Sequence, residues 1–194
     1  MVMPLRRAPF GMWSEGGEGF AVVQIVALDA VDPHAVEALL DRAFGPERHL
    51  RTAYRVRQGT LPIRPFSFAA LSEDGKLAGT IQSWPVALAS DSGPMVPLVM
   101  VGPVAVEPDL QQGGIGRRLM LEMLDAADVS ALPGAEALML IGDPEYYGRF
   151  FGFDASRTTR WRLPGPFEPR RLLARGAAVP NCSGMLVPRL RKVA

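Results

Sequence analysis

The most constraining feature of this sequence is an apolar stretch that runs into a bend rich in glycine. Residues 99–106 are largely apolar, which predicts a buried strand, and Gly113, Gly114 and Gly116 follow a short loop. From Ile115 onward, apolar residues recur at helical spacing. A strand that enters a helix through such a bend presents free main-chain N–H groups and the positive end of a helix dipole. The segment therefore predicts a site for a phosphate or diphosphate group.

Two familiar nucleotide-binding loops do not match this bend. A Walker loop needs Lys and then Ser or Thr after its glycines, whereas Arg117 and Arg118 follow Gly116 here. A dinucleotide-binding turn needs a third glycine three residues after the second, and that position is Leu119. What remains is the pattern Gln-x-x-Gly-x-Gly over residues 111–116.

This pattern resembles the acetyl-coenzyme A (acetyl-CoA) signature of the GNAT superfamily of N-acetyltransferases, which is Gln or Arg, two residues, Gly, one residue, and Gly or Ala. Two further segments are similar to the family. The strand at 102–106 leads into the signature, and residues 142–153 carry Tyr146, Tyr147 and a closing Gly-Phe pair. The resemblance extends over roughly residues 24–153.

The order of the expected elements agrees with that family. Strands are expected at 24–27, 66–71, 77–88, 95–106, 137–141, 160–163 and 184–187, and helices at 33–44, around 50–55, at 115–132 and after Asp143-Pro144. The resemblance implies an α/β (α+β) fold of three layers, in which a mixed, mostly antiparallel sheet of six to seven strands splays at its centre between helices on both faces. We expect residues 21–194 to form this single domain and residues 1–20 to be a flexible leader.

Charge and composition argue against several other functions. The chain has 21 Lys and Arg against 20 Asp and Glu, and a net charge of +1, so no strong field would hold a nucleic acid or a membrane surface. No uncharged apolar run is long enough to cross a bilayer, and no apolar segment follows Arg6 and Arg7 as in a signal peptide. The single cysteine, Cys182, suits a reducing compartment. We therefore expect a cytoplasmic protein.

The resemblance implies acetyl-CoA as co-substrate. Its pantetheine arm would pair with the backbone of Val104, Ala105 and Val106, and amides of the bend would bind its diphosphate. The expected residues of the bend are Gln111, Gln112, Gly113, Gly114, Ile115, Gly116 and Arg117. His34 and His49 lie far apart in the sequence without a second metal-like partner, so no metal is expected.

Transfer of an acetyl group to an amine needs an acid for the leaving thiolate and a base for the ammonium. A simple thiol has a pKa near ~8.5, so a weak acid suffices. The resemblance implies a tyrosine at the start of the helix after the fifth strand, where Tyr146 and Tyr147 both stand, and Tyr147 is favoured.

The base is harder to place. Many GNAT enzymes carry a carboxylate on the central strand, but Gly102 and Pro103 occupy the usual positions here. Glu107 and Asp109 come after the strand and are expected to face solvent. The sequence therefore names no base.

The acceptor cannot be read from the sequence. In GNAT enzymes the region of Arg51, Tyr54 and Arg55 walls the acceptor pocket, and cations there would suit an acceptor with a carboxylate or phosphate, although these arginines would equally fit an exposed face. Our main hypothesis is an enzyme that acetylates the amine of a small molecule from acetyl-CoA. The alternatives are a GNAT-fold module that binds acyl-CoA without turnover, and an acetyltransferase of protein N-termini or lysines. A homodimer that exchanges the residues beyond Phe153 is also considered.

Overall fold

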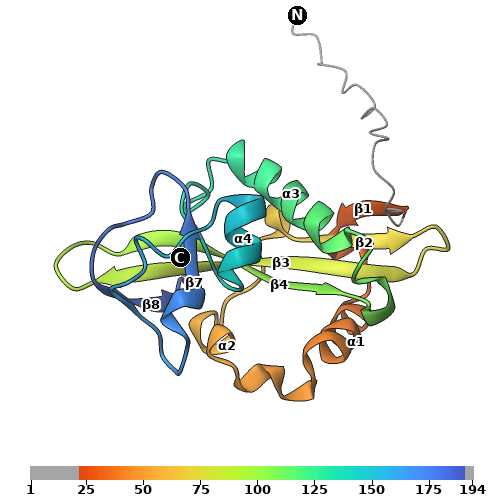
Figure 1. Ribbon diagram of the computed structural model, residues 1–194, viewed down its shortest axis with the longest axis horizontal. Helices are drawn as coiled ribbons and strands as arrows, with labels where there is room; N and C mark the ends of the chain where they lie inside the picture. The colour runs from red at the N-terminus through yellow and green to blue at the C-terminus, as the bar shows by residue number, and fades with distance from the viewer. Residues whose placement is uncertain (1–21, 191–194) are drawn as a thin grey trace, which may run out of the picture.

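The computed structural model describes residues 22–190, so the leader expected at 1–20 lies outside the described residues. Within them, eight strands form one mixed sheet in the order β1-β2-β3-β4-β5-β7, while β8 pairs with both β3 and β6 (Figure 1). The strands are β1 (Val23–Ala27), β2 (Phe68–Ser72), β3 (Leu77–Ser90), β4 (Val96–Val106), β5 (Leu138–Ile141), β6 (Trp161–Arg162), β7 (Leu172–Arg175) and β8 (Gly184–Pro188). Seven of them were expected, and β7 is the addition.

Four α-helices begin or end where the sequence provides a signal. They are α1 (Pro33–Phe44), α2 (Thr52–Val56), α3 (Ile115–Asp128) and α4 (Pro144–Phe151). Asp32 and Asp143 cap α1 and α4, each accepting a hydrogen bond from the backbone N–H two residues later, at 3.0 and 3.1 Å. Helix α3 ends before the expected Leu132, because its buried stripe stops at Ala127 and the next apolar residue, Val129, is 88% exposed.

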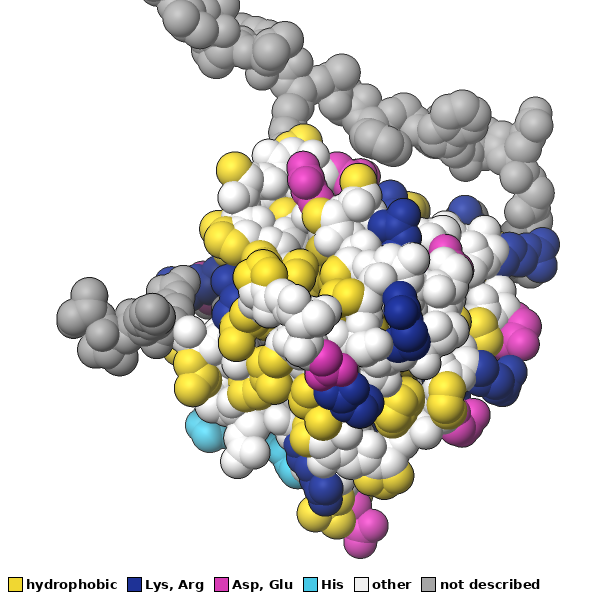
Figure 2. Space-filling view, turned by 90° about the vertical axis from the view of Figure 1, so that its left-hand side faces the viewer, with side chains coloured by type: hydrophobic (Ala, Val, Ile, Leu, Met, Phe, Trp, Pro, Cys, Tyr) yellow, Lys and Arg dark blue, Asp and Glu magenta, His cyan; other side chains and the backbone are white. Residues whose placement is uncertain are grey.

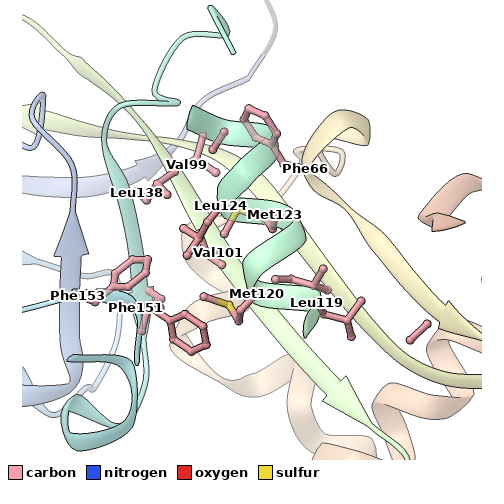
Figure 3. Close-up of a cluster of buried hydrophobic side chains, with 14 of the residues drawn as sticks. Phe66, Val99, Val101, Leu119, Met120, Met123, Leu124, Leu138, Phe151 and Phe153 are labelled. Carbon is pink, nitrogen blue, oxygen red and sulfur yellow. The ribbon is translucent and has the colours of Figure 1, made fainter. Parts of the chain in front are cut away.

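The helices cover the sheet on both faces, which confirms the expected three-layer fold. Helices α3 and α4 lie on one face, and α1 and α2 lie on the other (Figure 1). Met120, Met123 and Leu124 of α3 are buried in one cluster with Val99 and Val101 of β4 (Figure 3). Burial of such side chains stabilises a fold by roughly 1.5–3 kcal/mol each. This packing fixes the start of α3 relative to β4.

Strands β4 and β5 pair over a short length only. They are parallel and pair at Val99 with Leu138 and at Met100 with Met139. Strand β4 then continues to Val106 along β3, while β5 receives no further residue of β4. We call the unpaired stretch between residues 101–106 of β4 and the end of β5 the split. It confirms the expected splay at the centre of the sheet.

The surface shows no single dominant charge on the face drawn in Figure 2, which is the left-hand side of Figure 1. Lys and Arg side chains stand there in separate groups between apolar and acidic ones. Among residues 22–190, no helix is long and apolar enough to span a membrane.

Candidate functional site

A bulge in β4 decides which main-chain groups face the split. Val99 N–H donates to Ala137 O at 3.1 Å, on the β5 side, whereas Glu107 N–H donates to Ala78 O at 2.9 Å, on the β3 side. In a regular strand, residues an even number apart point to the same edge. The register of β4 against β3 shifts within residues 101–104, which inserts one extra residue and accounts for the change of side.

The consequence concerns the residues after the bulge. Because Glu107 donates toward β3, alternation directs the N–H groups of Val104 and Val106 toward the split, and that of Ala105 toward β3. Of the three strand residues expected to meet pantetheine, Val104 and Val106 therefore offer main-chain donors there. Ala105 does not, and its side chain packs with α1 on the other face.

The glycine bend leaves the start of α3 uncapped. Gly114 adopts φ +70°, a left-handed conformation that glycine takes without strain, and no side chain caps the helix. The first bond to the helix backbone runs from Arg118 N–H to Gly114 O at 3.0 Å. The amides of Ile115, Gly116 and Arg117 precede it, and none of them donates to another described residue. Three free donors thus stand at a positive helix end.

One amide of the bend differs from the expectation. Gly113 N–H already donates to Leu110 O at 3.0 Å, so it is not available to a ligand without breaking that turn. The side chains of Gln111, Gln112 and Arg117 are exposed, and the Arg117 guanidinium lies 5.2 Å from the ring centroid of Phe150.

A cavity of about 500 Å³ opens in the split. Its walls include residues 100–104 of β4, residues 140–143 at the end of β5, and Tyr147 of α4. Arg51, which precedes α2, and Tyr54 of α2 also line it, so three separate segments, β4, α2 and α4, bring expected residues together there. We call this space the split cavity.

The two expected tyrosines are placed differently. Tyr147 lines the split cavity, and burial raises its pKa to about 12, so its hydroxyl stays protonated at neutral pH. Tyr146 does not line it, is 37% exposed, and packs at 5.3 Å from the ring of Phe150. Geometry therefore favours Tyr147 as the residue that meets a ligand.

Tyr54 is held by a cluster of arginines, two of which the sequence analysis did not single out. The buried Arg48 pairs with Glu37 at 2.5 Å and with Asp41 at 2.7 Å, and it also donates to the Tyr54 hydroxyl. The guanidinium of Arg57 lies 4.0 Å from the centroid of the Tyr54 ring. Both arginines line the split cavity. Arg48 lies in a 3-10 helix (Pro46–Leu50) and Arg57 follows α2, so no helical periodicity indicated that they would be buried.

No free base stands on β4. Glu107, expected to face solvent, instead pairs with Arg42 at 2.5 Å and is 25% exposed in its side chain. Asp109 is exposed, as expected, and Asp143 serves as the cap of α4 although it also lines the split cavity. Within residues 22–190, no group of three or more His, Cys, Asp or Glu side chains could hold a metal ion.

Together, the split sheet, the uncapped helix start and the adjoining cavity define a domain of the acyltransferase class. The family model described as Acetyltransferase (GNAT) family matches residues 34–153, and the chain belongs to this family.

Two solved structures illustrate the likeness. The GNAT N-acetyltransferase YhbS from Escherichia coli, in complex with CoA, is 23% identical, with 90% of this chain and 94% of that chain covered and a TM-score of 0.67. A GNAT acetyltransferase from Brucella melitensis, in complex with acetyl-CoA, is 27% identical, with 81% and 98% covered and a TM-score of 0.47. A comparison with curated proteins gave no match.

Proposed function

We propose that this protein transfers the acetyl group of acetyl-CoA to the amine of a small molecule, by direct attack while both are bound. The observation that carries the proposal is the arrangement of the split. Free amides at the start of α3 and the free edge of β4 lead to a cavity that Tyr147 lines. The amides would bind a diphosphate, the strand edge would pair with an extended thioester arm, and the cavity would hold the reacting acyl group.

The residues present fit acetyl-CoA. The amides of Ile115, Gly116 and Arg117 would bind the diphosphate, and the edge of β4 at Val104 and Val106 would pair with the pantetheine arm. A Cβ built on Gly116 would lie 3.5 Å from Cγ2 of Val106, so the two binding elements adjoin. The E. coli protein with the same fold was solved with CoA, which supports this assignment.

The chemistry requires one bond to form and one to break. The amine nitrogen attacks the acetyl carbon, the carbon–sulfur bond breaks, and the sulfur takes up a proton. The N–H of Val104 or Val106 would stabilise the oxyanion, and loss of one such donor in acyl transfer typically costs about 3 kcal/mol. A fixed donor of this kind needs no rearrangement during the reaction.

Tyr147 would supply the proton to sulfur. With a pKa of about 12, the phenol is a weaker acid than a thiol of pKa ~8.5, so it cannot simply ionise first. It would donate a hydrogen bond to the developing thiolate and pass its proton to sulfur, and the tyrosine oxygen would regain a proton, through solvent, from the attacking amine. The amine proton would leave to solvent, because β4 carries no free carboxylate at the split.

The absence of that carboxylate also favours a second candidate, a module that binds acyl-CoA without turnover. Isothermal titration with CoA, followed by measurement of free thiol released from acetyl-CoA in the presence of a panel of amines, separates the two. Binding with amine-dependent thiol release supports the enzyme, and binding without release supports the module. A purified chain with no affinity for CoA or acetyl-CoA contradicts both.

A further inference from the structure

Two arginines of the split cavity have no carboxylate partner among the described residues. Arg57 is 5% exposed, and the hydrogen bond it forms is a long one, from Nη1 to Gly102 O at 3.3 Å. Arg51 donates to Phe44 O at 2.9 Å, and its guanidinium lies 5.6 Å from the centroid of the Phe44 ring. Arg48 differs, because two carboxylates already neutralise it. The cavity thus keeps two arginines that form no salt bridge with a described residue.

Two aromatic rings and one carbonyl group surround the guanidinium of Arg57. Its central carbon lies over the rings of Tyr54 and Trp84, at 4.0 and 4.1 Å from the two centroids. Of its five N–H donors, one is accepted by Gly102 O. A buried cation without a partner is costly, and an anion of a ligand would offset that cost.

Burial also changes the pKa of Arg57. It lowers this pKa to about 10, which leaves the guanidinium charged at neutral pH. An anion bound at its edge would meet a fixed, charged fork of donors, the geometry that suits carboxylate and phosphate oxygens.

Acidic groups lie at another part of the cavity wall. Asp143 lines it where β5 ends, next to Gly142, against which the ring of Tyr147 packs. Glu168 also lines the cavity, but Arg170 and Arg171 approach it at 3.6 and 4.0 Å. The carboxylate of Asp143 therefore stands on the side of the reacting tyrosine, where an ammonium group would bind favourably.

We propose that the acceptor is an amine that also carries an anionic group, a carboxylate or a phosphate, which binds to Arg57 and Arg51. This inference rests on the proposed function. A second cavity of about 510 Å³, which Arg57 also lines, suits such an anion less well, because Glu37 lines it and Arg51 does not.

The test measures thiol release from acetyl-CoA with matched amines. β-Alanine is compared with propylamine, and O-phosphoethanolamine with ethanolamine, so that the two pairs separate carboxylate from phosphate. We expect kcat/KM to be at least about 10-fold higher for the anionic member of one pair, the gain of a charge-assisted hydrogen bond. Equal or faster turnover of both neutral amines overturns this inference and leaves the proposed function standing. Absence of thiol release with any amine, despite CoA binding, overturns both.

Variants test the two arginines directly. In Arg51→Gln, whose side chain is exposed, KM for the preferred anionic amine should rise about 10- to 100-fold, several times more than KM for its neutral partner. Arg57→Gln should act the same way, and thermal unfolding checks that it folds. Arg64→Gln is the control, since that side chain is 83% exposed and lies outside the cavity. An equal loss on anionic and neutral amines would contradict a role in binding the anion.

Discussion

The ring of Tyr147 rests directly on the backbone of Gly142, so that a Cβ built on Gly142 would lie 2.6 Å from Cδ2 of the ring. Gly142 follows β5 and Tyr147 belongs to the first turns of α4, so this contact sets the tyrosine against the edge of the split. No side chain other than hydrogen fits between them.

Gly142→Ala should therefore displace the tyrosine ring. We expect kcat to fall about 10-fold or more, with KM for acetyl-CoA little changed, and a loss of about 1–3 kcal/mol in stability from overpacking. Steady-state kinetics and urea unfolding measure the two effects. Gly93→Ala is the matched control, because its Cβ would meet Ser90 Oγ at an ordinary 3.5 Å. Unchanged kcat in Gly142→Ala would show that the position of the ring does not matter.

Tyr147→Phe should lower kcat about 100-fold, the range of a missing general acid, while the affinity for CoA stays the same. Tyr146→Phe should retain most of the activity, since Tyr146 does not line the split cavity. Calorimetry and single-turnover kinetics provide the readouts. The reverse order of the two variants would assign the acid to Tyr146.

Gly114→Ala should weaken binding of acetyl-CoA. Its φ of +70° costs a residue with a side chain about 1–2 kcal/mol, and relief of that strain would turn the amides of the bend away from the diphosphate. We expect KM for acetyl-CoA to rise about 10-fold. Gly75→Ala imposes similar strain at φ +77° in the turn between β2 and β3, so it should lower stability without altering KM. Equal KM values for acetyl-CoA in the two variants would show that the bend does not bind acetyl-CoA.

The pKa of Tyr147 has a consequence for stability at high pH. Burial raises it from 10.0 to about 12, so between these values the folded chain holds a proton that the unfolded chain has lost. The contribution of this group is therefore fully present below pH 10 and disappears as the pH rises to 12. Tyr147→Phe should show a shallower loss of stability over this interval in chemical unfolding, and an identical slope in both proteins would contradict the shift.

Much of the fold could be predicted because the sequence signals local events. Asp-Pro pairs predicted the starts of α1 and α4, and the Glu73–Lys76 turn predicted the β2–β3 hairpin. Strand β7 was missed because its apolar run is only Leu172–Ala174, after the charged Arg170 and Arg171. Its assignment depends on pairing with β5, a contact that no local pattern encodes.

The candidate site was predictable to the same extent. The bend and the two tyrosines follow from motif and order. The engagement of Gly113 N–H with Leu110 O depends on a 3-10 turn (Pro108–Leu110) that the sequence analysis did not identify. Which arginine near α2 would be buried depends on how that helix docks, since Arg51 is exposed and Arg57 is not.

The extra residue in β4 has a consequence for how its length can vary. If the backbone groups of β4 alternated regularly from Val99, residues 103 and 105 would face the split with their main-chain N positions. Pro103 has no N–H, so only Ala105 would offer a donor. The extra residue reverses this alternation, so that the N–H of Val104 faces the split instead. By the same alternation, insertion or deletion of a single residue after Val104 would turn every later amide of β4 to the opposite edge. In this segment, the number of residues is thus as much a determinant of chemistry as their identity.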